Sequence, residues 1–248
     1  MISPRLELEL LRWRLAGRRA RLWWRDDDAA AAGPELNRLL TISADTATPL
    51  ALAVIPAGDM AGLAPALASA GQVTVVQHGV DHQNRREGAA AGEFAHDWPQ
   101  ARLAAEISRG WGRIAGLPGA LQVFVPPWND VHPALEAALR DCGFVGWSAE
   151  GSVDAGPLPR RDVHLDLLRW RGGARFRGRA RFLAALRREL ARRRRDGRWD
   201  APIGILTHHL AHDAPAWRFL AAFLRWSQGR PQLAWVDLQS LLPEQAAT

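Results

Sequence analysis

The chain has 248 residues, of which 48% are hydrophobic and 23% are charged, a balance that predicts a folded core and argues against disorder. The formal net charge is +6, and all 32 positive side chains are arginines. Since lysine and tyrosine are both absent, mechanisms that need a Schiff-base lysine, a phosphate-binding lysine or a tyrosine acid are excluded. The single cysteine, Cys142, excludes an internal disulfide and a multi-cysteine zinc site, and we expect it to be a small buried side chain.

The hydropathy of the chain predicts its location. No run approaches the roughly 18 apolar residues that a membrane span needs. The first 25 residues carry charges and contain no apolar signal core. We therefore expect a cytoplasmic protein without a membrane span.

Segments with the patterns of helices and strands alternate along the chain. Residues 1–19 have the pattern of an amphipathic helix and are expected to form an N-terminal helical extension. Short apolar runs then predict strands at 22–25, 50–55, 73–77, 121–125, 144–147, 163–168, 203–207 and 233–236. Helical patterns lie between them at 34–42, 61–70, 99–115, 133–141, 179–195 and 215–226. This alternation predicts parallel strands with helical crossovers, and the number of units favours a single (β/α) barrel domain over residues 20–248.

Polar side chains follow several of the predicted strands. Five of the eight histidines lie at or just beyond strand ends. Because reactive groups of such folds gather at the carboxyl ends of the strands, these positions are candidates for an active site.

Two of these strand ends carry groups that suit a metal ion. His78 and His82 are four residues apart, so both reach one side of the loop if it makes a single helical turn. The run Asp26–Asp28 follows the first strand, and adjacent carboxylates are tolerated where a cation neutralises them. One aspartate can complete a metal site with the two imidazoles, and a neighbour can be the general base for the attacking water. The alternatives are two surface histidines and a helix cap at Asp28.

Further candidates come from later strand ends. His208 is placed to protonate a leaving group, whereas His209 is expected to point elsewhere because strand residues alternate between faces. His208 and His212 are also four apart, which leaves a second metal pair open. The segment after the fourth predicted strand holds Pro126, Pro127, Trp128 and Asn129. Its rigid backbone and aromatic face suit the wall of a sugar-binding cleft, and a simple turn is the alternative.

Arginines are concentrated in one part of the chain. The stretch from Arg169 to Arg198 holds 13 arginines against two acids, Glu189 and Asp196. Much of it has a helical pattern with one apolar face, which predicts a solvated helix surface. The alternative is a surface that binds an acidic partner.

Taken in order, these motifs resemble those of the polysaccharide deacetylase family, the NodB-type carbohydrate esterases. The motifs that carry the resemblance lie between about residues 20 and 240, and they are Asp26–Asp28, His78 with His82, Val125–Asn129, Asp166 with Trp170, and Leu206–His208. The resemblance implies an α/β fold, a distorted (β/α)7 barrel. It also implies a divalent metal, with zinc first and cobalt, nickel or iron as alternatives, held by Asp28, His78 and His82.

The same resemblance implies a reaction. Asp27 would be the base and His208 the acid in the hydrolysis of an N-acetyl or other N-acyl group on a sugar or glycoconjugate. A second register, with Asp26 as base and Asp27 as ligand, stays open, although Ala29 favours the first because a small residue normally follows the pair. Substrate-binding positions would be Pro126, Pro127, Trp128, Asn129, Asp166 and Trp170.

The chain departs from the family pattern at three positions. The glycine after the aspartate pair is absent, and His209 stands where an aspartate often follows the late histidine. Val125 stands where the family commonly has an arginine that orients the base, and Arg25 is a candidate to replace that arginine.

Two other functions stay open. The absence of the family's arginine at position 125 is compatible with a non-catalytic barrel. Such a barrel would bind a glycan or nucleic acid through its arginines, although nucleic acid is not the expected partner. A non-haem iron oxygenase is the second, because two histidines and a carboxylate form its metal site, here His164, Asp166 and His208.

Overall fold

The computed structural model describes residues 3–88, 90–151 and 156–243. The main sheet contains β1 (Ala20–Ala29), β2 (Leu50–Val54), β3 (Val73–His78), β4 (Ala120–Val125), β5 (Gly146–Trp147), β6 (Val163–Asp166), β9 (Ile203–Thr207) and β10 (Leu233–Trp235). The helices are α1 (Pro4–Leu15), α2 (Pro34–Asp45), α3 (Met60–Ala68), α4 (Gln100–Ile114), α5 (Leu135–Asp141), α6 (Arg179–Arg195) and α7 (Ala214–Gln228). A hairpin of β7 (Leu168–Arg169) and β8 (Arg175–Phe176) and three 3₁₀ turns, η1 (Pro127–Asn129), η2 (His209–Ala211) and η3 (Gln239–Leu241), complete the described elements.

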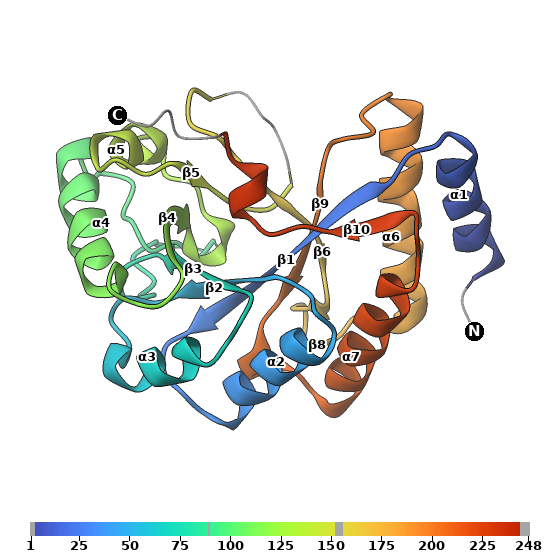
Figure 1. The fold of residues 1–248 in the computed structure, drawn as a ribbon. Coiled ribbons are helices and arrows are strands. Elements are labelled where there is room, and N and C mark those ends of the chain that lie inside the picture. Colours follow the sequence, from blue (N-terminus) through green and yellow to red (C-terminus); the bar gives the residue numbers. More distant parts are fainter. Residues whose placement is uncertain (1–2, 89, 152–155, 244–248) are drawn as a thin grey trace.

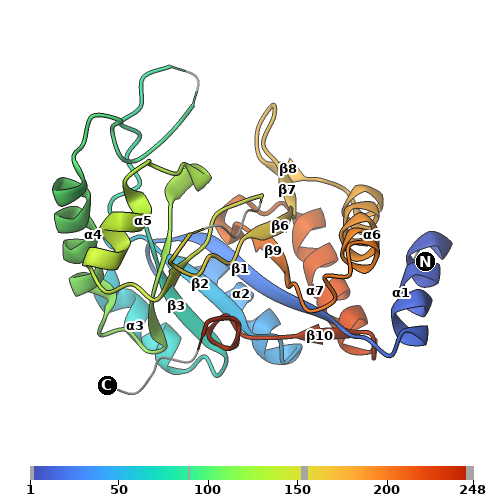
Figure 2. The same cartoon turned by 90° about the horizontal axis from the view of Figure 1, so that it is seen from above.

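The main sheet curls into a distorted barrel. Its strands are parallel and lie in the order β5-β4-β3-β2-β1-β9-β6, with β10 pairing along the start of β1. Parallel bridges join Trp147 to Arg160 and Glu150 to Val163, so the two ends of the sheet meet. Helices α2 to α7 surround this sheet (Figures 1 and 2). The prediction of a single-domain (β/α)7 barrel is confirmed.

The strands are apolar on both faces because both faces are covered. Every residue of β2 and of β9 is buried, which is the pattern of parallel strands packed between helices and a barrel interior. Trp23, Val76 and Leu206 belong to a core cluster inside the barrel, whereas Trp24 and Leu52 pack in the cluster beneath the helices.

The N-terminal helix α1 packs against α6 at the edge of the barrel. Leu6, Leu10 and Trp13 are buried in the same core cluster as the outer faces of the strands. The indole Nε1 of Trp13 donates to the carbonyl of Leu190 in α6, at 3.3 Å.

Strand β1 is longer than its apolar run predicts. It extends to Ala29, so the three aspartates lie in its last part and not after its end. The reason is that Asp26 is paired with β2 and β9 before the ladder shifts register between Asp26 and Ala29.

No helix in the described ranges combines the length and the apolar character that crossing a membrane requires.

Candidate metal centre and active site

The three consecutive aspartates of β1 face three different partners. Asp26 contacts His209, Asp27 contacts Arg25, and Asp28 contacts the two histidines of the third strand end. Simple alternation would place Asp26 and Asp28 on the same face. Asp28 instead has a φ of 72°, which turns its side chain away at the irregular end of β1.

Asp28, His78 and His82 form the candidate metal centre. Oδ1 of Asp28 lies 3.1 Å from Nε2 of His78 and 3.2 Å from Nε2 of His82. One ligand atom from each residue lies within 4.8 Å of the others. Nδ1 of His78 lies 3.1 Å from the carbonyl of Val125 and donates to it, so Nε2 is the ring nitrogen that faces Asp28. Two imidazoles and one carboxylate that converge in this way fit a divalent ion such as zinc.

The electrostatics of this cluster reflect the same contacts. Burial raises the pKa of Asp28, but hydrogen bonds from His78 and His82 outweigh it and hold that pKa below its usual range. Burial lowers the pKa of His78, whereas Asp28 and the charge of Asp27 raise it further than burial lowers it. The carboxylate is therefore ionised at neutral pH, as a metal ligand must be.

The two histidines do not meet through a helical turn, so that part of the prediction is wrong. The segment after β3 is an irregular loop in which Gly79 and His82 have φ values of 58° and 56°. The buried carboxylate of Glu93 holds this loop by accepting the backbone N–H groups of Val80 at 2.9 Å, Asp81 at 2.7 Å and His82 at 2.6 Å. Glu93 follows no strand, so the strand-end rule gave no reason to choose it.

Arg25 holds Asp27 from the same strand. Its Nε lies 2.8 Å from Oδ1 and its Nη2 donates to Oδ2 at 2.9 Å, a two-point contact between fully buried groups. Arg25 also donates to the hydroxyl of Ser148 at 2.6 Å and to Oδ1 of Asn129 at 3.0 Å. Val125 packs in the barrel interior. A guanidinium therefore faces the candidate base even though position 125 has none.

Asp26 and His209 form a buried pair beside this site. Nδ1 of His209 lies 2.5 Å from Oδ1 of Asp26, and the hydroxyl of Thr207 donates to Oδ2 at 2.5 Å. Burial raises the pKa of Asp26, but the His209 charge outweighs it and lowers that pKa overall. Because Asp26 lies with His209 and Asp28 with the two histidines, the geometry favours Asp27 and Asp28 as base and ligand.

His208 lies at the carboxyl end of β9 beside Trp170 and Asp166. The ring centroids of His208 and Trp170 are 4.6 Å apart in an edge-on contact, and the Trp170 indole donates to Asp166 at 2.7 Å. Burial raises the pKa of Asp166, while the His208 charge lowers it to a smaller extent. His208 is also close enough to lower the pKa of Asp28. Nδ1 of His208 is buried and has no hydrogen-bond partner among the described residues.

The segment after β4 brings an aromatic ring to the site. Pro126 and Pro127 are buried, whereas Trp128 is 41% exposed. Trp128 and Asn129 have φ values of 56° and 55°. This backbone sets the Trp128 ring 4.3 Å from the ring of His82, so the indole forms part of the rim of the metal centre.

Other sequence-derived candidates do not converge. Within the described residues, Asp28, His78 and His82 are the one group of three ligand side chains close enough to share an ion. His164 binds instead at the amino end of β9, where its Nδ1 accepts the backbone N–H of Gly204 at 3.0 Å. The iron site of His164, Asp166 and His208 is therefore wrong, because the first lies at the opposite end of the barrel from the third. The cap of helix α2 is Gly33 and not Asp28.

The fold is shared with solved polysaccharide deacetylases. The chain is similar to a candidate polysaccharide deacetylase from Mycobacterium smegmatis, at 15% identity over 91% of this chain and 89% of that one, with a TM-score of 0.66. It is similar to a family 4 carbohydrate esterase from Streptomyces lividans in complex with acetate, at 16% identity, 88% and 91% coverage and a TM-score of 0.56. It is also similar to a family 4 acetyl xylan esterase from Clostridium thermocellum in complex with a cobalt ion, at 14% identity, 89% coverage of both chains and a TM-score of 0.53.

Comparison with protein-family models and with curated proteins finds no match. The resemblance to polysaccharide deacetylases that the motif order indicated is confirmed for the fold by the solved structures.

Proposed function

We propose that this protein is a metal-dependent carbohydrate deacetylase that hydrolyses an N-acetyl or other N-acyl group on a sugar or glycoconjugate. One observation carries the proposal. The cluster of Asp28, His78 and His82 lies at the same barrel end as a buried carboxylate held by Arg25 and as the imidazole of His208. Zinc is the expected ion, with cobalt, nickel or iron as alternatives. Bound by these three residues, it would supply Lewis acidity toward the acyl carbonyl and would acidify water.

Asp27 is the base in this proposal. Arg25 contacts both of its carboxylate oxygens and fixes the plane of the group. Each carboxylate oxygen has a second lone pair, so Asp27 can still accept a proton from the attacking water. The water oxygen then bonds to the acyl carbon.

His208 is the acid. When the C–N bond breaks, the nitrogen must take up a proton, because an amine anion is a very poor leaving group. The imidazolium of His208 gives that proton. The edge contact with Trp170 fixes the ring orientation.

The sugar ring would bind between exposed indoles. Trp128 is 41% exposed beside His82, and Trp170 is 48% exposed beside His208. Indole faces are large apolar surfaces that suit the C–H faces of sugars. The arginine missing at Val125 favoured a non-catalytic binding protein, whereas the contact of Arg25 with Asp27 supports a catalytic one.

The test combines metal content with hydrolysis of an N-acetylated chito-oligosaccharide. Wild type and a control, His96→Ala at an exposed position outside the cluster, are expected to hold about one divalent ion per chain by elemental mass spectrometry. His78→Ala should lose the ion. His208→Ala should keep it and lose about 10²- to 10⁴-fold in turnover, the usual contribution of general acid catalysis. Wild-type protein that binds no zinc, cobalt or nickel after reconstitution would contradict the proposal.

A further inference from the structure

A second cavity lies at the other end of the barrel and is lined mainly by arginines. It has a volume of about 610 Å³, within the roughly 300 to 1,000 Å³ typical of small-molecule sites. Its walls come from the start of β1, the segment entering β6, the end of α6 and the loop before β9. These are the amino ends of strands whose carboxyl ends carry the candidate active site. Arg21 and Asp28, both in β1, are seven residues apart, which corresponds to roughly 20 Å along a strand.

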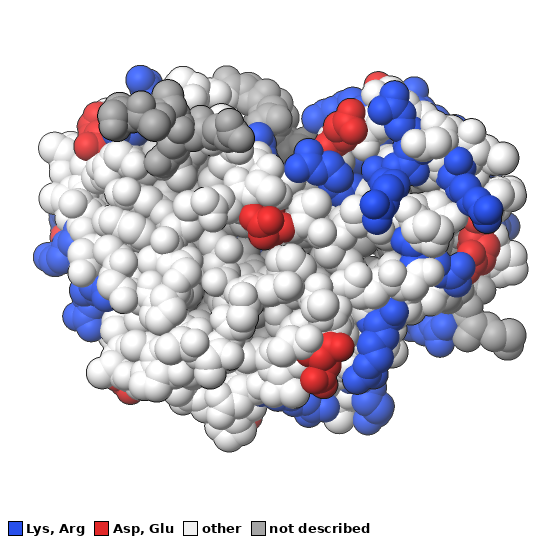
Figure 3. All heavy atoms as spheres, in the orientation of Figure 1, with Lys and Arg blue, Asp and Glu red and all other residues white. Residues whose placement is uncertain are grey.

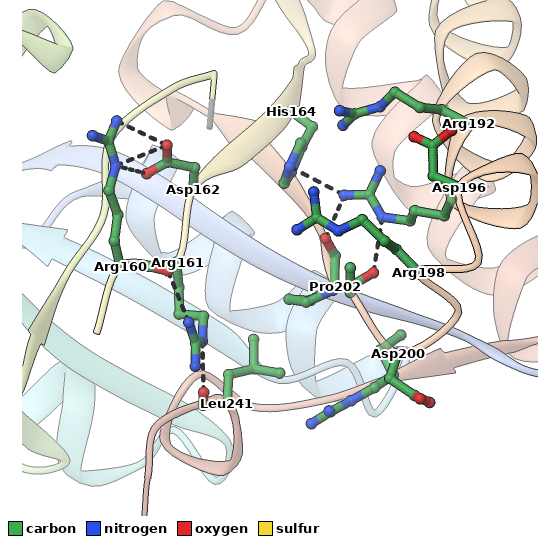
Figure 4. A pocket seen from close by; sticks show the side chains of 13 residues that line it. Arg160, Arg161, Asp162, His164, Arg192, Asp196, Arg198, Asp200, Pro202 and Leu241 are labelled. Atoms are coloured by element: carbon green, nitrogen blue, oxygen red, sulfur yellow. Dashed lines mark hydrogen bonds and ion pairs between the residues drawn. The ribbon is translucent and has the colours of Figure 1, made fainter. Parts of the chain in front are cut away.

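The charge of the lining is strongly positive. Six arginines face three aspartates around the cavity, and they are Arg21, Arg160, Arg161, Arg192, Arg193 and Arg198. Their guanidinium groups enter from two sides, with Arg160 and Arg161 on one side and Arg192 and Arg198 on the other (Figure 4). Positively charged side chains also gather on the surface over α6 (Figure 3). The stretch interpreted from sequence as a solvated helix face thus supplies part of a cavity wall.

Some of these arginines have a carboxylate partner, whereas two of them have none among the described residues. Arg160 makes a two-point contact with Asp162, and Arg193 is buried against Glu189 and the carbonyls of residues 201 and 202. In contrast, no carboxylate of the described residues lies within ion-pair distance of Arg21 or Arg198. Charge that is unmatched in a concave site favours an anionic ligand.

Two N–H donors in the cavity wall have no acceptor among the described residues. Nε of Arg192 is buried and has no acceptor among the described residues. His164 accepts a backbone N–H at Nδ1, so its neutral form carries the proton on Nε2, which faces Arg193 Nη2 at 3.1 Å. Two donors that face each other repel. Burial and the charge of Arg193 accordingly lower the pKa of His164 to about 4, which keeps the ring neutral.

We propose that this cavity binds a diphosphate group, either free or as part of a nucleoside diphosphate. Guanidinium groups bind phosphate oxygens in pairs and cannot lose their charge, which suits this ligand. Several arginines on opposite walls match the two charged centres of a diphosphate better than the single centre of a monophosphate. The exposed carboxylates of Asp196 and Asp200 at the cavity suit hydroxyl groups of an attached ribose.

The experiment is calorimetric titration of the whole chain with inorganic diphosphate, ADP and inorganic phosphate. Wild type is expected to bind diphosphate, with phosphate at least tenfold weaker. Arg198→Ser should weaken diphosphate binding at least tenfold. Arg225→Ser removes the same charge from an exposed position on α7 and should change binding less than twofold. His78→Ala should bind diphosphate as wild type does, because the metal centre lies at the opposite end.

The outcomes separate the sources of the ligand. Tighter binding of ADP than of diphosphate supports a nucleoside diphosphate, and equal binding supports recognition of the diphosphate alone. The proposal is overturned if wild type binds no diphosphate at about 1 mM, or if Arg198→Ser and Arg225→Ser weaken binding equally. Loss of binding in His78→Ala would also overturn it, because the metal centre would then be the binding site.

Discussion

The buried contact between Arg25 and Asp27 makes a quantitative prediction about stability. Arg25→Met keeps most of the side-chain volume and removes the charge. It would leave the carboxylate of Asp27, which is 2% exposed, without the guanidinium that contacts both of its oxygens. Breaking a buried pair by removing one partner costs about 3 to 5 kcal/mol. The hydroxyl of Ser148 and the amide oxygen of Asn129 would lose a donor as well, at about 1 kcal/mol each.

The expected loss is therefore about 5 kcal/mol or more, a large share of the roughly 5 to 15 kcal/mol by which domains are stable. The assay is urea unfolding of the metal-free protein, followed by circular dichroism. Asp27→Asn and the double variant complete a cycle that isolates the pair. The double variant buries no charge at either position, so we expect a coupling of about 2 kcal/mol or more between the two sites.

Two further variants serve as a fallback and as a control. If Arg25→Met does not fold, Arg25→Lys can be measured in its place. It keeps the charge but loses the two-point contact with Asp27, so its stability should lie between those of wild type and Arg25→Met. Arg230→Met breaks a partly exposed pair with Glu7 and should cost about 1 kcal/mol or less. The reasoning is refuted if Arg25→Met costs less than about 1 kcal/mol, or if the coupling with Asp27→Asn is near zero.

Three more predictions concern the loop after β3, the titration of a buried histidine and the site rim. Gly79→Ala should destabilise the protein by about 1 to 3 kcal/mol in urea unfolding, because a Cβ would clash with Glu93 and Pro127 at a left-handed φ; wild-type stability would contradict this. Burial lowers the pKa of His212 to about 4, so the unfolded chain takes up a proton first as pH falls from 6.5 to 4, and stability is lost in that window. Wild type should therefore lose about 2 kcal/mol more than His212→Phe between pH 7 and pH 5, and equal losses would show that the ring titrates normally. Trp128→Ala should raise KM for an N-acetylated oligosaccharide about tenfold, equivalent to about 1.4 kcal/mol, without loss of bound metal; an unchanged KM would remove the indole from the binding surface.

Much of the fold and part of the site could be predicted from sequence. Apolar runs and helical periods mark the strands and helices, because strands such as β2 and β9 are buried on both faces. The strand-end rule singled out His78, His82 and the run Asp26–Asp28, and the family resemblance pointed to Asp28 within that run; the structure brings Asp28 and the two histidines together. These predictions depend on positions along the chain, which the sequence records directly.

The remaining features depend on side-chain direction. The left-handed backbone at Asp28 breaks the alternation that would have assigned partners to the aspartates. Glu93 supports the histidine loop from eleven residues beyond His82, with no periodic signal. The arginine cavity is lined by segments more than 100 residues apart, Arg21 and Arg198 among them. The sequence therefore indicated an excess of arginines but could not predict that they line one cavity.

Because the site residues come from different strands, parts of the site should differ in how easily they are distorted. Arg25 and Asp27 lie two residues apart on β1, so their separation is set by one backbone. The candidate metal centre is different, because Asp28 comes from β1 whereas His78 and its loop partner come from β3 and the segment after it. Strand β2 lies between β1 and β3. A small shift of β3 relative to β1 would therefore separate Asp28 from the two histidines. It would leave the distance between Asp27 and Arg25 unchanged. An ion bound by these three residues would be released by mild heat or denaturant before the orientation of Asp27 is disturbed.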